Sequence, residues 1–171
     1  MSNIKHTHGY PFYMIYESGP RIGQVDLDHP EYNYWMCRMR YFDWTYELHL
    51  MLLEFQDYKC ACCGEPLNLE KRPVSSGKGP FYYHLDHDHA YGESQGSDRP
   101  GLISVRSYLC RACNDLLGKI ENRGENNPDF SLEKFVGLDG DIGQCIFNPP
   151  AQRMLKEHGI YVPQPSVALF S

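Results

Sequence analysis

The spacing of apolar residues changes several times along this chain. From position 43 to 56, apolar side chains recur at intervals of three and four residues, with glutamates between them. This period puts the apolar side chains on one face and predicts an amphipathic helix over 43–56, which Asp43 or Thr45 would cap. The apolar positions are Leu48, Met51, Leu52 and Phe55.

Residues 1–42 lack such a period. They are crowded with aromatic residues and interrupted by glycine and proline, which favours short strands and turns over a long helix. We expect the aromatic side chains to pack onto the core rather than to form a platform for stacked bases. The aromatic positions are Tyr10, Phe12, Tyr13, Tyr16, Tyr32, Tyr34, Trp35, Tyr41 and Phe42.

Beyond position 57, short runs of strand-forming residues are separated by polar, glycine-rich stretches. A zinc-knuckle-like turn is expected to open the segment 58–69. Strands are then expected within 58–69 and over 81–86 and 102–109. Helices are expected over 114–121, 131–136 and 150–158.

The composition is that of a folded protein. Charged residues make up 22% and hydrophobic residues 42% of the 171 positions, as in ordinary globular domains. The sequence shows neither a signal-like N-terminus nor an apolar run long enough to cross a bilayer, so we expect a soluble, intracellular protein with no membrane partner. The net charge of −6 argues against a protein that coats nucleic acid non-specifically, and restricts any such contact to a local site.

Four of the seven cysteines form two Cys-x-x-Cys pairs, Cys60 with Cys63 and Cys110 with Cys113. Two such pairs in an intracellular protein indicate a metal rather than disulfides, and four thiolates predict a closed, structural zinc site. Gly64 suits the left-handed turn that closes the first knuckle. A redox pair or buried free thiols are the alternatives. The cysteines expected to stay outside the site are Cys37, Cys62 and Cys145.

Between the two pairs lies the run His84-Leu85-Asp86-His87-Asp88-His89, and Asn114 directly follows the second pair. Oxygen ligands such as Asp86 and Asn114 suit a hard cation, and a neutral histidine such as His87 suits proton abstraction from water. In a flat strand Asp86 and His87 point to opposite faces, so joint action on one phosphate requires the strand to bulge or end there. Solvated surface histidines and a second structural metal are the alternatives.

Together these motifs resemble the phage recombination endonuclease VII family of HNH-like nucleases, also called His-Me finger or ββα-metal nucleases. The resemblance covers roughly residues 46–121, and the combined pattern is far more specific than any one part. One departure is Arg106-Ser107-Tyr108-Leu109-Cys110, where the family commonly has Arg-Gly-Leu-Leu-Cys. The matching runs are Tyr58-Lys59-Cys60-Ala61-Cys62-Cys63-Gly64, His84-Leu85-Asp86-His87-Asp88-His89, Val105-Arg106-Ser107-Tyr108-Leu109-Cys110-Arg111-Ala112-Cys113-Asn114 and Leu117-Gly118.

The resemblance implies an α+β fold with a zinc-stabilised ββα-metal core over 57–123. An aromatic-rich arm and helix over 1–56 would precede the core, and a helical extension over 124–171 would follow it. His87 would be the general base, and Asp86 and Asn114 would hold a catalytic Mg²⁺ or Mn²⁺. The residues expected beside the substrate phosphate are His84, His89 and Arg106.

The implied function is a metal-dependent DNA endonuclease that hydrolyses phosphodiester bonds in the cytoplasm of a bacterial or phage-infected host cell. Branched or recombination-intermediate DNA is a candidate substrate, and a homodimer is a candidate assembly. One rival is the same fold repurposed as a non-nuclease metalloenzyme acting on a small molecule, which a closed apolar pocket over His87 would favour. The other is a zinc-stabilised interaction module without catalysis.

Overall fold

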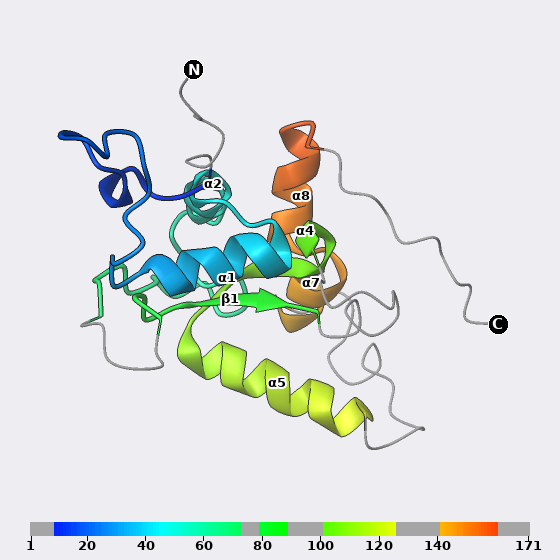
Figure 1. Cartoon of the computed structure of the whole chain (residues 1–171). Helices are drawn as coiled ribbons and strands as arrows, with labels where there is room; N and C mark the ends of the chain where they lie inside the picture. The colour runs from blue at the N-terminus through cyan, green and yellow to red at the C-terminus, as the bar shows by residue number, and fades with distance from the viewer. Residues whose placement is uncertain (1–8, 73–78, 89–100, 126–140, 161–171) are drawn as a thin grey trace.

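The computed structural model describes residues 9–72, 79–88, 101–125 and 141–160 (Figure 1). In these segments, helices surround an antiparallel β-hairpin, which gives the mixed α+β fold expected from the sequence. Along the chain the elements are η2 (Phe12–Met14), α1 (Tyr32–Phe42), α2 (Tyr46–Phe55), β1 (His84–His87), α4 (Gly101–Ser104), β2 (Val105–Leu109), α5 (Arg111–Glu125), α7 (Asp141–Phe147) and α8 (Pro150–Glu157). Within these described segments, no helix is both long enough and apolar enough to span a membrane.

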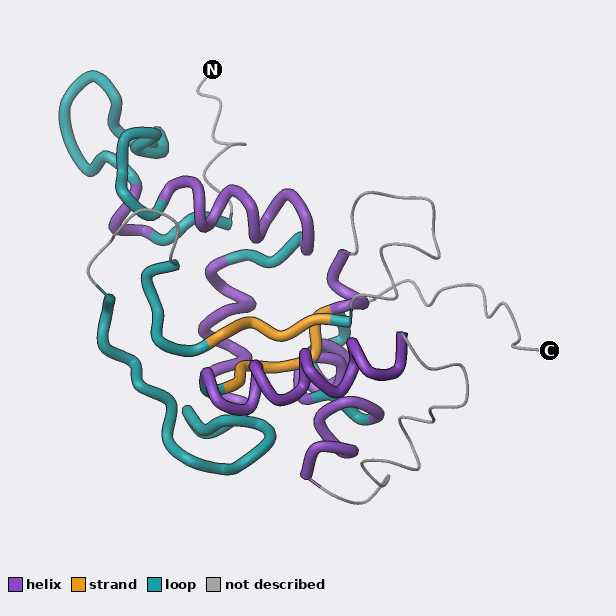
Figure 2. The backbone as a smooth tube through the Cα atoms, turned by 90° about the horizontal axis from the view of Figure 1, so that it is seen from below, coloured by secondary structure: helices purple, strands orange, loops and turns teal. Residues whose placement is uncertain are grey.

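The β1–β2 hairpin lies at the centre of the fold. Strand β2 is buried along its whole length, and it packs against α2, α7 and α8. Helix α5 packs against both strands from the other side, and the view from below shows it running across them (Figure 2). The hairpin and α5 therefore form the ββα arrangement that the family resemblance implies.

Helix α2 confirms the prediction made from the period of three and four residues. It begins one residue after Thr45, whose side-chain oxygen accepts a hydrogen bond from the Leu48 backbone N–H at 3.2 Å. Asp43, the other candidate cap, instead ends α1 with a left-handed backbone (φ 52°). The apolar face of α2 buries Leu48, Leu52 and Leu53.

The expectation of short strands and turns over residues 1–42 was wrong for its last part, where the structure has the eleven-residue helix α1. The sequence of this helix has no apolar period, and we infer that burial of the Trp35 side chain, which is fully buried, stabilises it. The Trp35 ring meets the rings of Tyr46 and His49 on α2 edge to face, at centroid distances of 5.1 and 5.2 Å. Such tertiary packing can override a weak local preference.

The strand expected over 102–109 starts only at Val105, because Gly101–Ser104 forms a single helical turn. The segment 58–69 contributes only an isolated bridge between Lys59 and Pro66 instead of a full strand. Helix α8 confirms the expected C-terminal helix, whereas α7 was not predicted. The helix expected over 131–136 lies outside the described residues.

Candidate functional site

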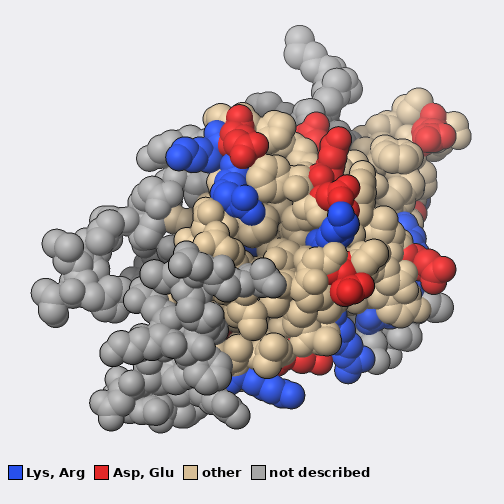
Figure 3. Space-filling view, turned by 180° about the vertical axis from the view of Figure 1, so that it is seen from behind, with Lys and Arg blue, Asp and Glu red and all other residues tan. Residues whose placement is uncertain are grey.

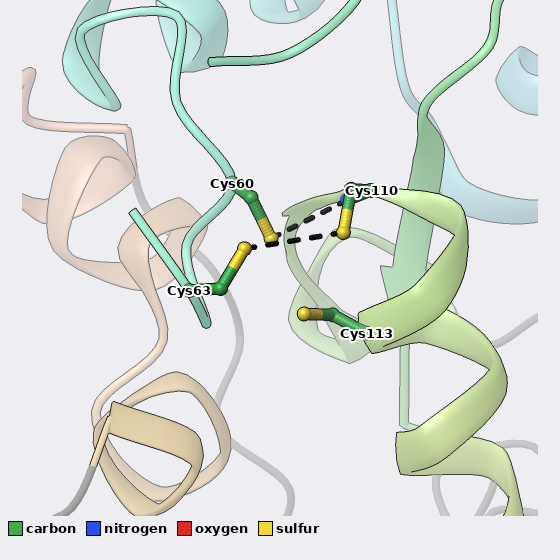
Figure 4. A group of neighbouring side chains, drawn as sticks. All are labelled: Cys60, Cys63, Cys110 and Cys113. Carbon is green, nitrogen blue, oxygen red and sulfur yellow. Dashed lines mark hydrogen bonds between the residues drawn. The ribbon is translucent and has the colours of Figure 1, made fainter. Parts of the chain in front are cut away.

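The four predicted zinc cysteines lie together although 46 residues separate the two pairs. Their sulfur atoms are all within 4.8 Å of one another, and Cys63 Sγ lies 4.0 Å from Cys110 Sγ (Figure 4). Zinc–sulfur bonds of about 2.3 Å in a tetrahedron put the sulfurs roughly 3.8 Å apart, so small side-chain adjustments would close the site around one ion. The arrangement fits a structural zinc site of four thiolates.

Local backbone structure preorganises the first knuckle. Gly64 has a left-handed backbone (φ 70°), as expected, and its N–H donates to the Cys60 carbonyl at 2.9 Å. The Cys110 N–H donates to Cys60 Sγ at 3.3 Å, which ties the two knuckles together. Burial raises the pKa of the Cys60 thiol, but hydrogen bonds from the backbone N–H groups of Cys110, Cys63 and Cys62 outweigh burial, so that the net shift is downward. The lowered pKa favours at Cys60 the thiolate that zinc requires, whereas burial raises the pKa of the Cys113 thiol.

A β-bulge lies at the predicted catalytic strand. Asp86 pairs with Ser107 and His87 pairs with Val105, so the register shifts by one residue between Asp86 and His87. The extra residue on β2 is Arg106. A bulge redirects side chains of the strand that carries the extra residue, here β2, and bulges are over-represented beside active sites. The extra residue lies on β2, whereas β1 itself ends at His87, which is the other outcome that the strand alternation allowed.

Asp86 is held by Arg106. Arg106 Nε donates to Asp86 Oδ2 at 2.7 Å and Nη2 donates to Oδ1 at 3.1 Å, which makes a two-pronged ion pair. The sequence resemblance implied that Arg106 contacts a substrate phosphate. In the structure, however, this side chain is 4% exposed and its guanidinium is engaged by protein oxygens.

His87 ends β1 beside α1. The ring centroid of Phe42, the last residue of α1, lies 4.7 Å from that of His87, with the planes tilted by 57°. The sequence did not predict a site role for Phe42, because residues 1–42 were expected to form strands and turns whose aromatic side chains pack onto the core. Its position directly before the helix predicted over 43–56 is a weak signal, because nothing nearby in the sequence links Phe42 to His87.

His84 begins β1, and its Nε2 is buried without a hydrogen-bond partner among the described residues. Burial lowers the pKa of His84, and the positive charges of Arg72, Arg38 and Arg111 lower it further. These arginines come from three separate segments and bring positive charge toward the start of β1.

Asn114 lies in the first turn of α5, and its N–H donates to the Cys110 carbonyl at 3.0 Å. The second knuckle therefore fixes the helical turn that carries Asn114. His89, the remaining predicted site residue, lies outside the described residues.

Comparison with known proteins agrees with this architecture. The family model for recombination endonuclease VII matches residues 36–135, which is more than half of the 171-residue chain and includes all four clustered cysteines. Neither a curated protein nor a solved structure matches the chain. The family match confirms the resemblance seen in the sequence motifs. The chain belongs to the recombination endonuclease VII family, and as a member it is a nuclease that acts on DNA.

Proposed function

We propose that the chain is a metal-dependent endonuclease in which His87 is the general base and Asp86 and Asn114 hold the catalytic cation. The observation that carries this proposal is that β1 ends at His87, directly after Asp86 and opposite the register shift in β2. A flat strand would send these neighbouring side chains to opposite faces, whereas the end of β1 releases His87 from that strict alternation. A purely structural zinc module has no need of this local break.

The residues proposed as cation ligands fit a hard divalent ion. Asp86 offers carboxylate oxygens and Asn114 an amide oxygen, the ligand types that Mg²⁺ and Mn²⁺ prefer. A carboxylate has about four lone-pair positions, so pairing with Arg106 does not by itself exhaust the capacity of Asp86. A cation there would supply Lewis-acid stabilisation of charge on the phosphate and the leaving oxygen.

Side chains of the protein would abstract the proton from water and orient the phosphate. His87 would take a proton from the attacking water, and Phe42 packs against its ring, restricting the orientations that the imidazole can adopt. His84 and His89 would orient the phosphate. The first turn of α5 also carries backbone N–H groups that favour a nearby anion.

Positive charge near this strand is consistent with a DNA backbone as the ligand. Arg38 stacks over the rings of Tyr34 and Phe42, at 4.8 and 5.9 Å, and Phe42 in turn contacts His87. On the face seen in Figure 3, Lys and Arg are interspersed with Asp and Glu among uncharged residues. A confined set of arginines around strand β1 therefore suits the net charge of −6 better than a broad basic face.

The small-molecule alternative would require a closed apolar pocket over His87. One apolar pocket among the described residues lies away from the candidate site, because Asp86, His87 and Asn114 do not line it. Its walls are Cys62, Leu109, Cys113, Leu116, Leu117, Ile142 and Cys145. We favour DNA over a small molecule because the chain belongs to a nuclease family. Branched DNA is our proposed preferred substrate, since it is the natural form of a recombination intermediate, and a homodimer would supply two sites for two strands.

The test is a cleavage assay with zinc-loaded protein on supercoiled plasmid, a four-way junction and single-stranded DNA. Mg²⁺ or Mn²⁺ is added or left out, rather than removed by a chelator, so that the structural zinc stays in place. We expect cleavage only with the added cation and fastest on the junction, and Asp86→Asn should raise the cation concentration needed. Equal cleavage without the cation would refute the metal-dependent mechanism, and equal rates on all DNAs would refute the substrate preference.

A further inference from the structure

The guanidinium of Arg106 joins all three parts of the ββα core. From β2 it donates two hydrogen bonds to Asp86 on β1, and Nη2 also donates to the His87 carbonyl at 3.1 Å. Nη1 donates to Glu121 Oε1 on α5 at 2.6 Å. One side chain therefore fixes the proposed metal ligand, the backbone of the proposed base and the helix that carries Asn114.

Burial separates Arg106 from the arginines that can meet DNA. Its side chain is 4% exposed, whereas that of Arg111 is 76% exposed. A phosphate contact needs donors that the DNA backbone can reach, and the Arg106 donors instead meet Asp86, Glu121 and the His87 carbonyl. Because Arg106 is the extra residue of the bulge, the register shift itself turns this side chain toward Asp86.

We propose that Arg106 and Glu121 are positioning residues for the catalytic cation, holding the Asp86 carboxylate in the orientation that binds metal. This inference rests on the proposed function and reassigns Arg106 from substrate contact to support of a metal ligand. The planar fork of arginine fits both carboxylate oxygens and fixes the plane of the carboxylate. Glu121 Oε1 accepts a hydrogen bond from Nη1 and so restricts rotation of the guanidinium away from Asp86.

The charges of the cluster support the same role. Asp86, Arg106 and Glu121 together carry one net negative charge, which favours a cation beside Asp86. The ion pairs with Arg106 also reduce the repulsion between the buried carboxylate of Asp86 and the partly buried carboxylate of Glu121. Partners that orient metal ligands in this way commonly change metal affinity or activity by about 10–100-fold when mutated. Lysine at position 106 would keep the charge but lose the two-pronged geometry.

The variants Arg106→Lys and Glu121→Gln test whether Arg106 positions a metal ligand or contacts DNA, because the two roles affect different binding constants. Mn²⁺ binding is measured by calorimetry on zinc-loaded protein without DNA, and DNA binding is measured by fluorescence anisotropy at several salt concentrations without Mn²⁺. Zinc content and melting temperature report folding. Glu121→Gln keeps an acceptor for Arg106 and serves if Arg106→Lys does not fold. The exposed Arg153 of α8, changed to Lys, is the matched control.

We expect Arg106→Lys to weaken Mn²⁺ binding about tenfold or more, with the DNA dissociation constant within about twofold of the wild type. Glu121→Gln should act in the same direction to a smaller extent, and Arg153→Lys should change neither quantity. Unchanged Mn²⁺ binding in both variants would overturn the inference. So would weaker DNA binding with a salt dependence shallower by about one, the mark of a lost phosphate contact.

Failure of the positioning role can be distinguished from failure of the proposed endonuclease function. If wild-type protein cleaves DNA with Mn²⁺ but neither variant alters Mn²⁺ affinity, the nuclease mechanism stands and the positioning role falls. If the wild type binds no Mn²⁺ and cleaves no DNA, both fall. If the variants bind Mn²⁺ more weakly while the wild type cleaves no DNA, the positioning role stands and the proposed function falls.

Discussion

The ring of Phe42 packs against the ring of His87 at a centroid distance of 4.7 Å. This contact joins α1, from the N-terminal part of the chain, to the last residue of β1. Phe42 also lies within 5.9 Å of the Arg38 guanidinium. Helix α1 therefore contributes a wall of the candidate site, although it lies largely outside the motifs that carried the family resemblance.

Replacing Phe42 by Leu should lower the rate of DNA cleavage at saturating metal by about 10-fold or more, since a base that loses its packing partner is less often correctly aimed. The neighbouring Tyr41→Leu is the control, because Tyr41 lies on the same helix and is 41% exposed. Single-turnover rates on one DNA substrate provide the measurement. Equal rates for the two variants would show that Phe42 does not orient His87.

Cys60→Ser should abolish stoichiometric zinc and destabilise the core, because a structural zinc site contributes directly to folding. Cys62→Ser, two residues away in the same knuckle, should keep one zinc per chain. Metal content by atomic emission and melting temperature by scanning calorimetry distinguish the two. Loss of zinc in Cys62→Ser with retention in Cys63→Ser would show that the first pair is Cys60 with Cys62.

Arg38→Ala should weaken DNA binding and make the dependence of affinity on salt shallower by about one, as expected for one lost phosphate contact. The control is Arg153→Ala on α8, where Arg153 stacks over Phe55 at 5.5 Å. Anisotropy titrations between low and moderate salt give both slopes. Parallel slopes for wild type and Arg38→Ala would remove Arg38 from the DNA interface.

The buried His49 predicts how stability depends on pH. Burial, with a smaller contribution from the charge of Arg38, lowers the pKa of His49 to about 3 from 6.5. Its Nδ1 lies 2.7 Å from the Tyr108 hydroxyl, which also accepts from Trp44 Nε1 and can donate to a neutral ring. The unfolded chain binds this proton more readily, so the contribution of His49 is fully present above pH 6.5 and is lost as the pH falls toward 3.

The loss should approach ~1.4 kcal/mol of unfolding free energy per pH unit within that window. We expect His49→Gln, which does not titrate, to lose less stability than the wild type between pH 7 and about 5.5. Urea unfolding with excess zinc at each pH measures the difference. If the two proteins lost stability in parallel, His49 would not be buried in its neutral form.

What the sequence could predict depended on local chemistry. Helix α2 followed from a repeated apolar period, and the Gly64 turn followed from the spacing of Cys60 and Cys63. The need for the strand to bulge or end at Asp86 and His87 followed from strand alternation alone, and β1 ends at His87. Each of these features depends on residues that lie close together in the sequence.

The features that escaped prediction depend on contacts between distant segments. Helix α1 is stabilised by burial of Trp35 rather than by a period, and the Phe42–His87 contact joins residues 45 positions apart. The link from Arg106 to Glu121 exists because one extra residue in β2 turns Arg106 toward Asp86. Strand register of that kind is set by the folded hairpin and cannot be read from composition.

The central claim is that His87 activates water for attack on a phosphodiester, and the most direct measurement is the single-turnover cleavage rate of His87→Ala. The comparison uses zinc-loaded wild type and His158→Ala, whose histidine is exposed at the end of α8. Loss of a general base should slow cleavage by about 10²–10⁴-fold in His87→Ala, with zinc content and melting temperature unchanged and His158→Ala equal to the wild type. A folded, zinc-loaded His87→Ala that cleaves DNA at the wild-type rate would contradict the account.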